Sequence, residues 1–315
     1  MGSSGHDRSM KRRSRRLACL SLVLCLPPSF VGAGAARHFD EDGDRAHSAR
    51  IEKAVVGLKE TEQALFLYER IERVEERRSL NDTRAADVKI FRVFPAGTGA
   101  AHIPLGPDLA PANAEVYRSD LEKLLNSLMW AAQSGKPQRD AYERVAKKQK
   151  ERAELIDQTR SAFFFTLLGE EMRGDRKLLK FRMDPNPGYK PPTRTASIFT
   201  KVKGMVWLDK TSGQMARIEG DVTDDISFGL FLGKIYKGSH FMQERYEFGP
   251  GVWLPTFSEY DFDGRKFFSQ ISIHQKTFAS NYRRVGTPAD AIPLVKAELE
   301  KLAPATVGDK KSVVN

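Results

Sequence analysis

The sequence predicts an α+β fold, in which an antiparallel β-sheet is accompanied by helices in separate segments. From residue 161 to residue 285, apolar and polar residues alternate with a period of two. Short connections such as Gly174-Asp175 and Asp263-Gly264 tolerate positive φ, and tight turns of this kind join antiparallel neighbours. Between residues 107 and 160 the apolar residues instead recur every three or four positions, which is the spacing of an amphipathic helix.

The strands are predicted one by one from this alternation. In the second half of the chain we expect strands over residues 162–172, 176–183, 202–208, 214–222, 228–236, 239–248, 252–263 and 265–277. Residues 65–77 and 88–94 are expected to form an earlier strand pair, with a turn at Asn81-Asp82. The proline-rich stretch 184–192 cannot continue a strand, so we expect an irregular excursion there.

The helices are predicted in four places. A short helix is expected over residues 49–60, and a second carries its apolar stripe within 107–135, where Asp108 or Asn113 can cap its start. A more polar helix follows to about residue 160, and a last one covers 291–301. We therefore expect one domain over residues 49–285 with a helical insertion at about 107–160, followed by a short helix and a disordered tail over 286–315.

The first 36 residues predict export. Five basic residues lie between Lys11 and Arg16, an apolar run covers residues 17–26, and Ala33-Gly34-Ala35 fits the cleavage rule of signal peptidase. Ten apolar residues are too few for a membrane-spanning helix, which needs about 20. We expect a signal peptide over 1–36, a flexible leader over 37–48, and a mature protein in the periplasm, with association with the outer membrane left open.

Removal of this segment changes two properties of the chain. The net charge falls from +10 to about +5, because residues 1–36 hold six basic residues and one acidic residue. This weakens the case for nucleic-acid binding that a basic chain would otherwise suggest. Cys19 and Cys25 leave as well, so the mature protein has no thiol and no disulfide. No later apolar run approaches the length of a transmembrane helix, so none is expected in the mature chain.

The sequence offers no motif for covalent chemistry. No two histidines have the spacing of a metal site, and there is no nucleophile elbow or phosphate-binding loop. We therefore expect no catalytic residue, no metal and no cofactor. Paired acids occur at Glu170-Glu171, at Asp224-Asp225 and at Asp261 with Asp263, and surface or turn roles explain them best. His274 is expected to face solvent.

An ordered series of short motifs lies between residues 162 and 285. The series is Phe165-x-x-Leu168-Gly169-Glu170-Glu171, Pro185-x-Pro187-Gly188-Tyr189-Lys190-Pro191, Gly204-x-x-Trp207-Leu208-Asp209-Lys210, Glu219-Gly220-Asp221-Val222, Asp225-Ile226-Ser227-Phe228-Gly229, Lys237-Gly238-Ser239, Val252-Trp253-Leu254-Pro255 and Thr277-Phe278-Ala279-Ser280-Asn281-Tyr282-Arg283. It resembles uncharacterised exported bacterial proteins related to the outer-membrane lipoprotein-sorting (LolA/LolB-like) superfamily. The resemblance implies a strongly curved antiparallel sheet, an unclosed half-barrel, with helices on its concave side.

In the carriers that define this superfamily, the concave side binds acyl chains. The chain departs from them in its helical insertion, and their functional residues have no matching positions here. The alternation nevertheless suggests one apolar face that could line such a site. Its candidate residues are Phe163, Phe165, Leu179, Phe181, Met183, Val206, Leu208, Ile218, Met242, Tyr246, Phe267, Ile271 and Ile273.

This apolar face has two interpretations. It can be an ordinary core filled by the protein's own helix, for which the stripe Leu121-Leu125-Leu128 is suited, or it can remain partly open as a lipid groove. The sequence favours a periplasmic, non-enzymatic binding or carrier protein for a lipid or an acylated protein. One alternative is a cell-envelope interaction protein with a filled half-barrel, whose 107–160 helices contact a protein partner. A second is a hydrolase with a site that the sequence does not reveal.

Overall fold

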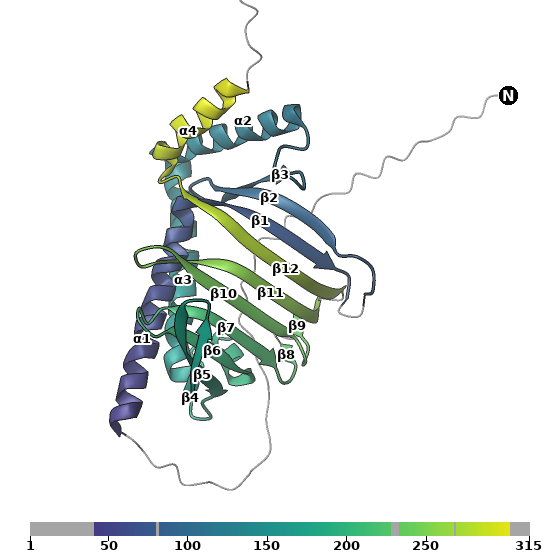
Figure 1. Cartoon of the computed structure of the whole chain (residues 1–315). Coiled ribbons are helices and arrows are strands. Elements are labelled where there is room, and N and C mark those ends of the chain that lie inside the picture. Colours follow the sequence, from purple (N-terminus) through teal and green to yellow (C-terminus); the bar gives the residue numbers. More distant parts are fainter. Residues whose placement is uncertain (1–40, 80–81, 228–232, 268, 303–315) are drawn as a thin grey trace, which may run out of the picture.

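The computed structural model describes residues 41–79, 82–227, 233–267 and 269–302 (Figure 1). The predicted signal peptide and the end of the predicted tail lie outside these residues, and so do the first five residues, 228–232, of the strand expected over 228–236. On either side of that gap the structure has two short strands, β8 (Ile226–Ser227) and β9 (Lys234–Ile235), which pair with each other.

The described strands form one twelve-stranded antiparallel sheet. Its main path runs in the order β3-β2-β1-β12-β11-β10-β7-β6-β5-β4, and β9 pairs with β11 beside this path. The main-path strands are β1 (Tyr68–Arg77), β2 (Asp87–Pro95), β3 (Ala100–Leu105), β4 (Phe163–Arg173), β5 (Arg176–Pro185), β6 (Val202–Asp209), β7 (Met215–Val222), β10 (His240–Gly249), β11 (Val252–Lys266) and β12 (Ser269–Arg284). Within the described residues no pairing joins β3 to β4, so the predicted open, curved antiparallel sheet is confirmed.

In the part of the chain that the structure describes, four α-helices and two 3-10 helices accompany the sheet. They are α1 (Glu41–Ala64), η1 (Leu65–Leu67), α2 (Ala114–Ala131), α3 (Lys136–Ala162), η2 (Ala196–Lys201) and α4 (Pro288–Lys301). The insertion predicted between residues 107 and 160 is therefore helical, and it separates β3 from β4. None of the helices in the described part of the chain is both long and apolar enough to span a membrane.

The central pairing of the sheet joins segments that are far apart in the sequence. Strand β1 pairs with β12 from Tyr68↔Arg284 to Arg77↔His274, with one irregularity near Ile71. Since β1 also pairs with β2, this contact attaches the β1–β2–β3 unit to the sheet built by the second half of the chain (Figure 1).

The face of the sheet that packs against α1 and α3 is called here the inner face. Ile51 and Val55 of α1 contact Phe181 of β5 and Leu208 of β6, and all four side chains are buried. On the same face, Leu155 of α3 packs at the edge of a second cluster. Burial of large apolar side chains stabilises by about 1.5–3 kcal/mol each, so this contact supplies much of the stability of the sheet.

Helix α1 is longer than the sequence suggests, because it begins at Glu41 inside the segment expected to be a flexible leader. The apolar spacing that predicts a helix starts near Ile51, and the residues before it are acidic and polar. Such residues suit the first turns of a helix, where the exposed backbone amides favour negative charge. A search for apolar periodicity therefore misses them.

Helices α2 and α4 pack on the opposite face, called here the outer face, near β2 and β3. Leu121, Leu124 and Leu128 of α2 are buried against Phe94 of β2 and Ile103 of β3. The stripe expected to fill the concave side therefore covers the other face. Helical spacing shows that a stripe is buried, but only the course of the chain decides which surface buries it.

Side-chain caps define where these two helices begin. Asn113, one of the two predicted caps, accepts a hydrogen bond from the backbone amide of Val116 at 2.9 Å. Helix α4 begins with a capping box, in which Thr287 and Asp290 bond to each other's backbone amides. Pro288 occupies the first turn, where its missing amide is not needed.

A buried arginine connects the sheet to the helix pair α2–α4. Arg92 of β2 donates to Glu69 of β1 at 2.8 Å, to the Tyr117 hydroxyl of α2 at 2.8 Å and to Glu298 of α4 at 2.7 Å. Burial disfavours the charged guanidinium, but the two carboxylates outweigh this and raise the pKa of Arg92 above its usual value. Arg283 of β12 pairs with Glu69 as well, so the cluster includes the central β1–β12 contact.

We expect Arg92→Met to lower the free energy of unfolding by about 3 kcal/mol, because it leaves the buried Glu69 with only one partner. Urea unfolding followed by circular dichroism measures the change. The control is Lys123→Met, which removes an exposed pair with Asp120 and should change stability by less than about 0.5 kcal/mol. Equal effects of the two substitutions would show that the Arg92 cluster is not a structural link.

The stability contributed by the contact between Arg92 and Glu298 depends on pH through the ionisation of Glu298. Burial raises the pKa of Glu298, but hydrogen bonds from Tyr117 and the charge of Arg92 outweigh it, so the folded value lies below the ordinary 4.5. The contribution of Glu298 is therefore fully present above the unfolded-state pKa and is lost as the pH falls through the folded-state pKa. Wild type should exceed Glu298→Gln in stability by about 2 kcal/mol at neutral pH. The difference should shrink as the pH is lowered below about 4.5, and a constant difference across acidic pH would contradict this assignment.

Candidate functional site

Most of the predicted lining residues lie in the packed interior of the inner face. Six of them are at most 5% exposed and belong to the clusters beneath α1 and α3: Phe163, Leu179, Phe181, Met183, Val206 and Leu208. Phe165 and Ile218 are partly buried against the same clusters. Over strands β4 to β7, then, the inner face is filled by the protein's own helices.

The apolar surface continues beyond this filled region. Phe241 of β10, Tyr260 of β11 and the predicted residues Ile271 and Ile273 of β12 are only half-buried. Register places them together, because Phe241 pairs with Tyr260 and Ile273 lies beside Phe262. These four residues are called here the inner strip.

Three predicted lining residues lie elsewhere. Met242 pairs with Glu219 and Glu259, whose side chains belong to the outer face. Tyr246 is 45% exposed and stacks under Arg176, and Phe267 is 50% exposed in the turn between β11 and β12. Alternation within one strand shows which residues share a face, but it does not show which faces of different strands coincide. Ligand binding by any of the predicted residues stays a prediction.

A charged cluster lies on the inner face beside the apolar region, and the sequence does not reveal it. Arg245 of β10 is 3% exposed and donates to Glu62 of α1 at 3.3 Å and to Gln243 at 2.8 Å. Glu62 also pairs with Arg152 of α3 at 2.9 Å. Burial lowers the pKa of the Arg245 guanidinium despite the nearby carboxylate. In the sequence Arg245 looks like any other charge on an alternating strand, so no local pattern identifies it.

Tyr282 of β12 completes this part of the inner face. Its hydroxyl donates to the carbonyl of Pro255 at 2.6 Å, and burial raises its pKa well above the usual value. On β1, Arg70 donates to Glu72 at 2.7 Å. Arg70, Glu72 and Arg245 all act electrostatically on Tyr282, so the charged cluster extends across β1, β12 and β10.

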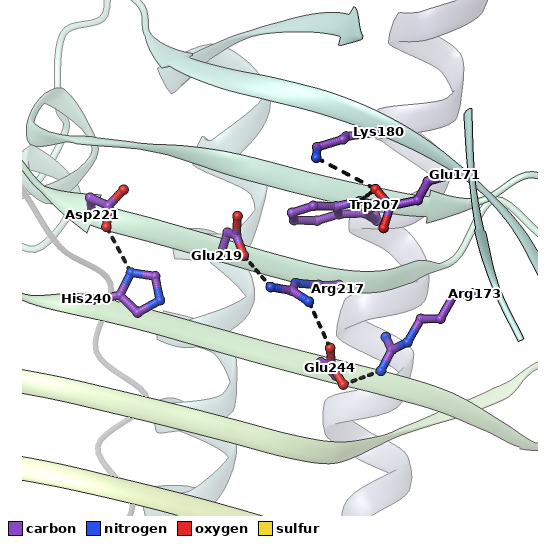
Figure 2. A network of polar contacts seen from close by, with 9 residues as sticks. All are labelled: Glu171, Arg173, Lys180, Trp207, Arg217, Glu219, Asp221, His240 and Glu244. Carbon is purple, nitrogen blue, oxygen red and sulfur yellow. Dashed lines mark hydrogen bonds and ion pairs between the residues drawn. The ribbon is translucent and has the colours of Figure 1, made fainter. Parts of the chain in front are cut away.

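The outer face over β4 to β10 carries a network of paired charges (Figure 2). Arg217 donates to Glu219 at 2.6 Å and to Glu244 at 3.2 Å, and Glu244 also pairs with Arg173. At the other end of the view, His240 contacts Asp221 at 2.8 Å. These groups neutralise one another within β7 and between strands, as expected for a solvated sheet surface.

An aromatic residue is enclosed within this network. Trp207 of β6 is 4% exposed, and its indole donates to Glu171 at 3.0 Å. Lys180 and Arg217 lie over the ring at 4.9 Å and 4.8 Å from its centroid. The long charged side chains thus shield the indole from water and leave it no surface for a ligand.

The structure corrects the expectation for His274. The residue lies on the outer face, as its place on the strand suggests, but it is only 5% exposed. Its two ring nitrogens face Asp261 at 3.2 Å and Asp263 at 3.3 Å. The two acids are two positions apart on β11, so they point to the same face and enclose the ring.

The paired acids at Asp224-Asp225 have the predicted turn role. Asp225 accepts from the backbone amide of Lys237 at 3.1 Å and pairs with Lys234, and these contacts lower its pKa. The two contacts of Asp225 connect the segment after β7 to the residues around β9. Among the described residues, no group of three or more His, Cys, Asp or Glu side chains has an arrangement that could hold a metal ion.

No protein-family model and no curated protein matches the sequence. Among solved structures, the chain is similar to a LolA superfamily protein from Nitrosomonas europaea, with 11% identity, 78% of this chain and 96% of that chain covered, and a TM-score of 0.28. A protein domain assigned to outer membrane lipoprotein sorting, from Vibrio parahaemolyticus, is 12% identical over 78% of this chain and 99% of that chain, with a TM-score of 0.28. A DUF1329 family protein from Desulfovibrio piger is 12% identical over 75% and 92%, with a TM-score of 0.25.

Two of these structures come from the superfamily that the sequence resembles. The strand pairings of this chain establish the open sheet.

The filled part of the inner face can be tested by truncating one side chain. We expect Phe181→Ala to lower the free energy of unfolding by about 3–5 kcal/mol, since the ring is fully buried and its removal leaves a cavity. Phe267→Ala is the matched control, because the Phe267 ring is 50% exposed. This substitution should lower the free energy of unfolding by no more than about 0.5 kcal/mol. If Phe181→Ala lowered the free energy of unfolding by no more than Phe267→Ala does, this region would be an open groove.

Proposed function

We propose that this protein is an exported, non-enzymatic binding or carrier protein of the bacterial cell envelope that takes up a hydrophobic ligand, either a lipid or an acylated protein. The observation that carries the proposal is the inner strip. Phe241, Tyr260, Ile271 and Ile273 continue the apolar core of the inner face at a point where burial becomes incomplete. An acyl chain that covers this surface would gain about 0.8 kcal/mol for each buried methylene group.

Access to more of the apolar face requires movement of α1 and α3. Charged side chains at the rim hold these helices to each other, with Lys59 bonded to Asp157 at 2.8 Å and Arg160 bonded to Glu52 at 2.7 Å. These groups are between 28% and 61% exposed, so each pair contributes at most about 1 kcal/mol. Weak polar contacts between the helices are compatible with a pair that shifts when a ligand enters. The proposed mechanism is burial of acyl chains between the inner strip and the helices, with no covalent step.

The periplasmic location rests on the sequence, in which a basic segment, an apolar run and a cleavage motif follow one another within residues 1–36. The described helices include none that could span a membrane.

Native mass spectrometry tests the proposal on protein extracted gently from the cell envelope. We expect a lipid adduct on the wild-type protein and about tenfold lower occupancy for Ile273→Glu, because a carboxylate on the inner strip must be desolvated when an acyl chain covers it. Phe278→Glu is the control on the same strand, since Phe278 lies on the outer face and is 39% exposed. A wild-type protein free of adduct, which also fails to bind added fatty acid, would overturn the proposal.

One observation favours the alternative of an envelope protein that contacts a partner through its insertion helices. Helix α2 exposes Val116, Met129 and Trp130, which are 54%, 45% and 38% exposed. Met129 and Trp130 are neighbours near the end of α2, and exposed apolar side chains that lie together are typical of a contact surface. If the native protein lacks lipid, crosslinking in intact cells through a photoreactive residue at Trp130 would test this second function.

A further inference from the structure

Arg245 is the most deeply buried of the described arginines whose guanidinium groups lack a hydrogen-bond partner at one nitrogen. Four arginines have a buried guanidinium nitrogen without a hydrogen-bond partner in the described part of the chain: Arg173, Arg176, Arg217 and Arg245. The first three side chains are 39%, 25% and 32% exposed, so the rest of each guanidinium reaches solvent. The Arg245 side chain is 2% exposed, and Nη1 is its unpartnered atom.

The groups around Arg245 do not neutralise it. The Glu62 carboxylate is 3.3 Å from Nη2 and is shared with Arg152 at 2.9 Å, while Gln243 supplies only a neutral oxygen. Arg70 and Glu72 form a pair of their own at 2.7 Å. The cluster therefore holds three guanidinium groups against two carboxylates, which leaves one positive charge.

A buried charge without a full set of partners is costly, and an oxyanion would supply what is missing. The guanidinium presents five donors in a planar fork that matches a carboxylate or a phosphate. Such charge-assisted hydrogen bonds are about twice as strong as neutral ones. The unpartnered Nη1, the long contact to Glu62 and the excess positive charge all favour an acidic group as the additional partner.

The position of Arg245 relates this cation to the inner strip. Phe241, Gln243 and Arg245 succeed one another on the inner face of β10, at alternate positions. At about 3.3 Å for each residue, the backbone positions of Phe241 and Arg245 are about 13 Å apart. An apolar chain lying on the strip can therefore extend along β10 toward the guanidinium.

We propose that Arg245 binds the acidic headgroup of an amphiphilic ligand, a carboxylate or a phosphate, whose acyl chain lies on the inner strip. This inference rests on the proposed function and narrows its ligand class to anionic amphiphiles. Glu62 competes with the ligand for the guanidinium, since both are anions directed at the same group.

The test compares two fluorescent probes that share one alkyl chain, a long-chain fatty acid and the corresponding alcohol, titrated into the mature protein at neutral pH. Wild type should bind the acid at least about tenfold more tightly than the alcohol. Arg245→Met should reduce the affinity for the acid to that for the alcohol and leave the alcohol unchanged. Arg245→Lys should retain part of the preference, and Glu62→Gln should strengthen binding of the acid alone.

Folding and charge have their own controls. Arg245→Met should stay folded, because Glu62 keeps its contact with Arg152 and, at 20% exposed, reaches solvent more readily than the 9% exposed Glu69 of the Arg92 cluster. Thermal unfolding of the variant verifies this. Arg217→Met, on the outer face, removes an equal charge and should alter neither affinity. If Arg245→Met unfolds, the preference of Arg245→Lys and of Glu62→Gln for the acid still decides the proposal.

Each remaining outcome contradicts a different statement. Equal affinities of the wild type for acid and alcohol would overturn the headgroup site and leave the proposed function intact. Failure to bind either probe would overturn both. Inorganic phosphate that binds through Arg245 as tightly as the fatty acid would identify a site for free oxyanions and overturn the assignment to an amphiphile.

Discussion

Burial of the inner face of the sheet beneath α1 and α3 is the contact on which the rest of the structure depends. An open antiparallel sheet with Phe181, Val206 and Leu208 on one face is unstable in water until something covers them. The chain covers them with α1, which precedes the sheet in sequence, and α3, which interrupts it. Strands β4 to β7 can then extend as an uninterrupted series of antiparallel neighbours.

The outer face is stabilised in a different way at each end. Over β4 to β10 it has no helix in Figure 1. Ion pairs occupy it instead, such as those of Arg217 with Glu219 on its own strand and with Glu244 on β10 (Figures 1 and 2). Over β2 and β3 it is covered by α2 and α4, which Arg92 connects to the sheet. The same sheet is therefore packed on opposite faces at its two ends. This offset leaves part of the inner face, around Ile271 and Ile273, only half-buried.

The packing of helices on opposite faces at the two ends of the sheet also determines where a ligand could bind. The filled region beneath α1 acts as a core, so uptake of a ligand has to begin where filling is incomplete. Beside this place the inner face changes from apolar to charged, with Arg245 buried and Tyr282 half-buried at the boundary. An apolar strip next to a buried cation has the chemistry of a site for an anionic amphiphile. The paired charges of Figure 2 do not, since each of them already contacts an opposite charge of the sheet.

The sequence alone determined the kinds of element and most of their limits. Alternation predicted β4, β5, β6, β7, β10 and β11 to within a few residues, because a strand at a sheet surface imposes a period of two on its own side chains. It missed β3, a short edge strand that contains Pro104, and it placed the start of α1 too late. Both errors occur where the local pattern is weak.

Only the tertiary structure decided which surfaces meet. Met242 and Ile273 look alike in their strands, yet register places them on opposite faces of the sheet. His274 is enclosed by two carboxylates of β11, and Arg245 is buried by Glu62, which lies 183 residues earlier in the chain. Such relations depend on strand pairing and on the path of helices across the sheet. A local sequence pattern indicates which face of its own strand a residue occupies. It does not indicate which residues from distant segments contact that residue in the folded chain.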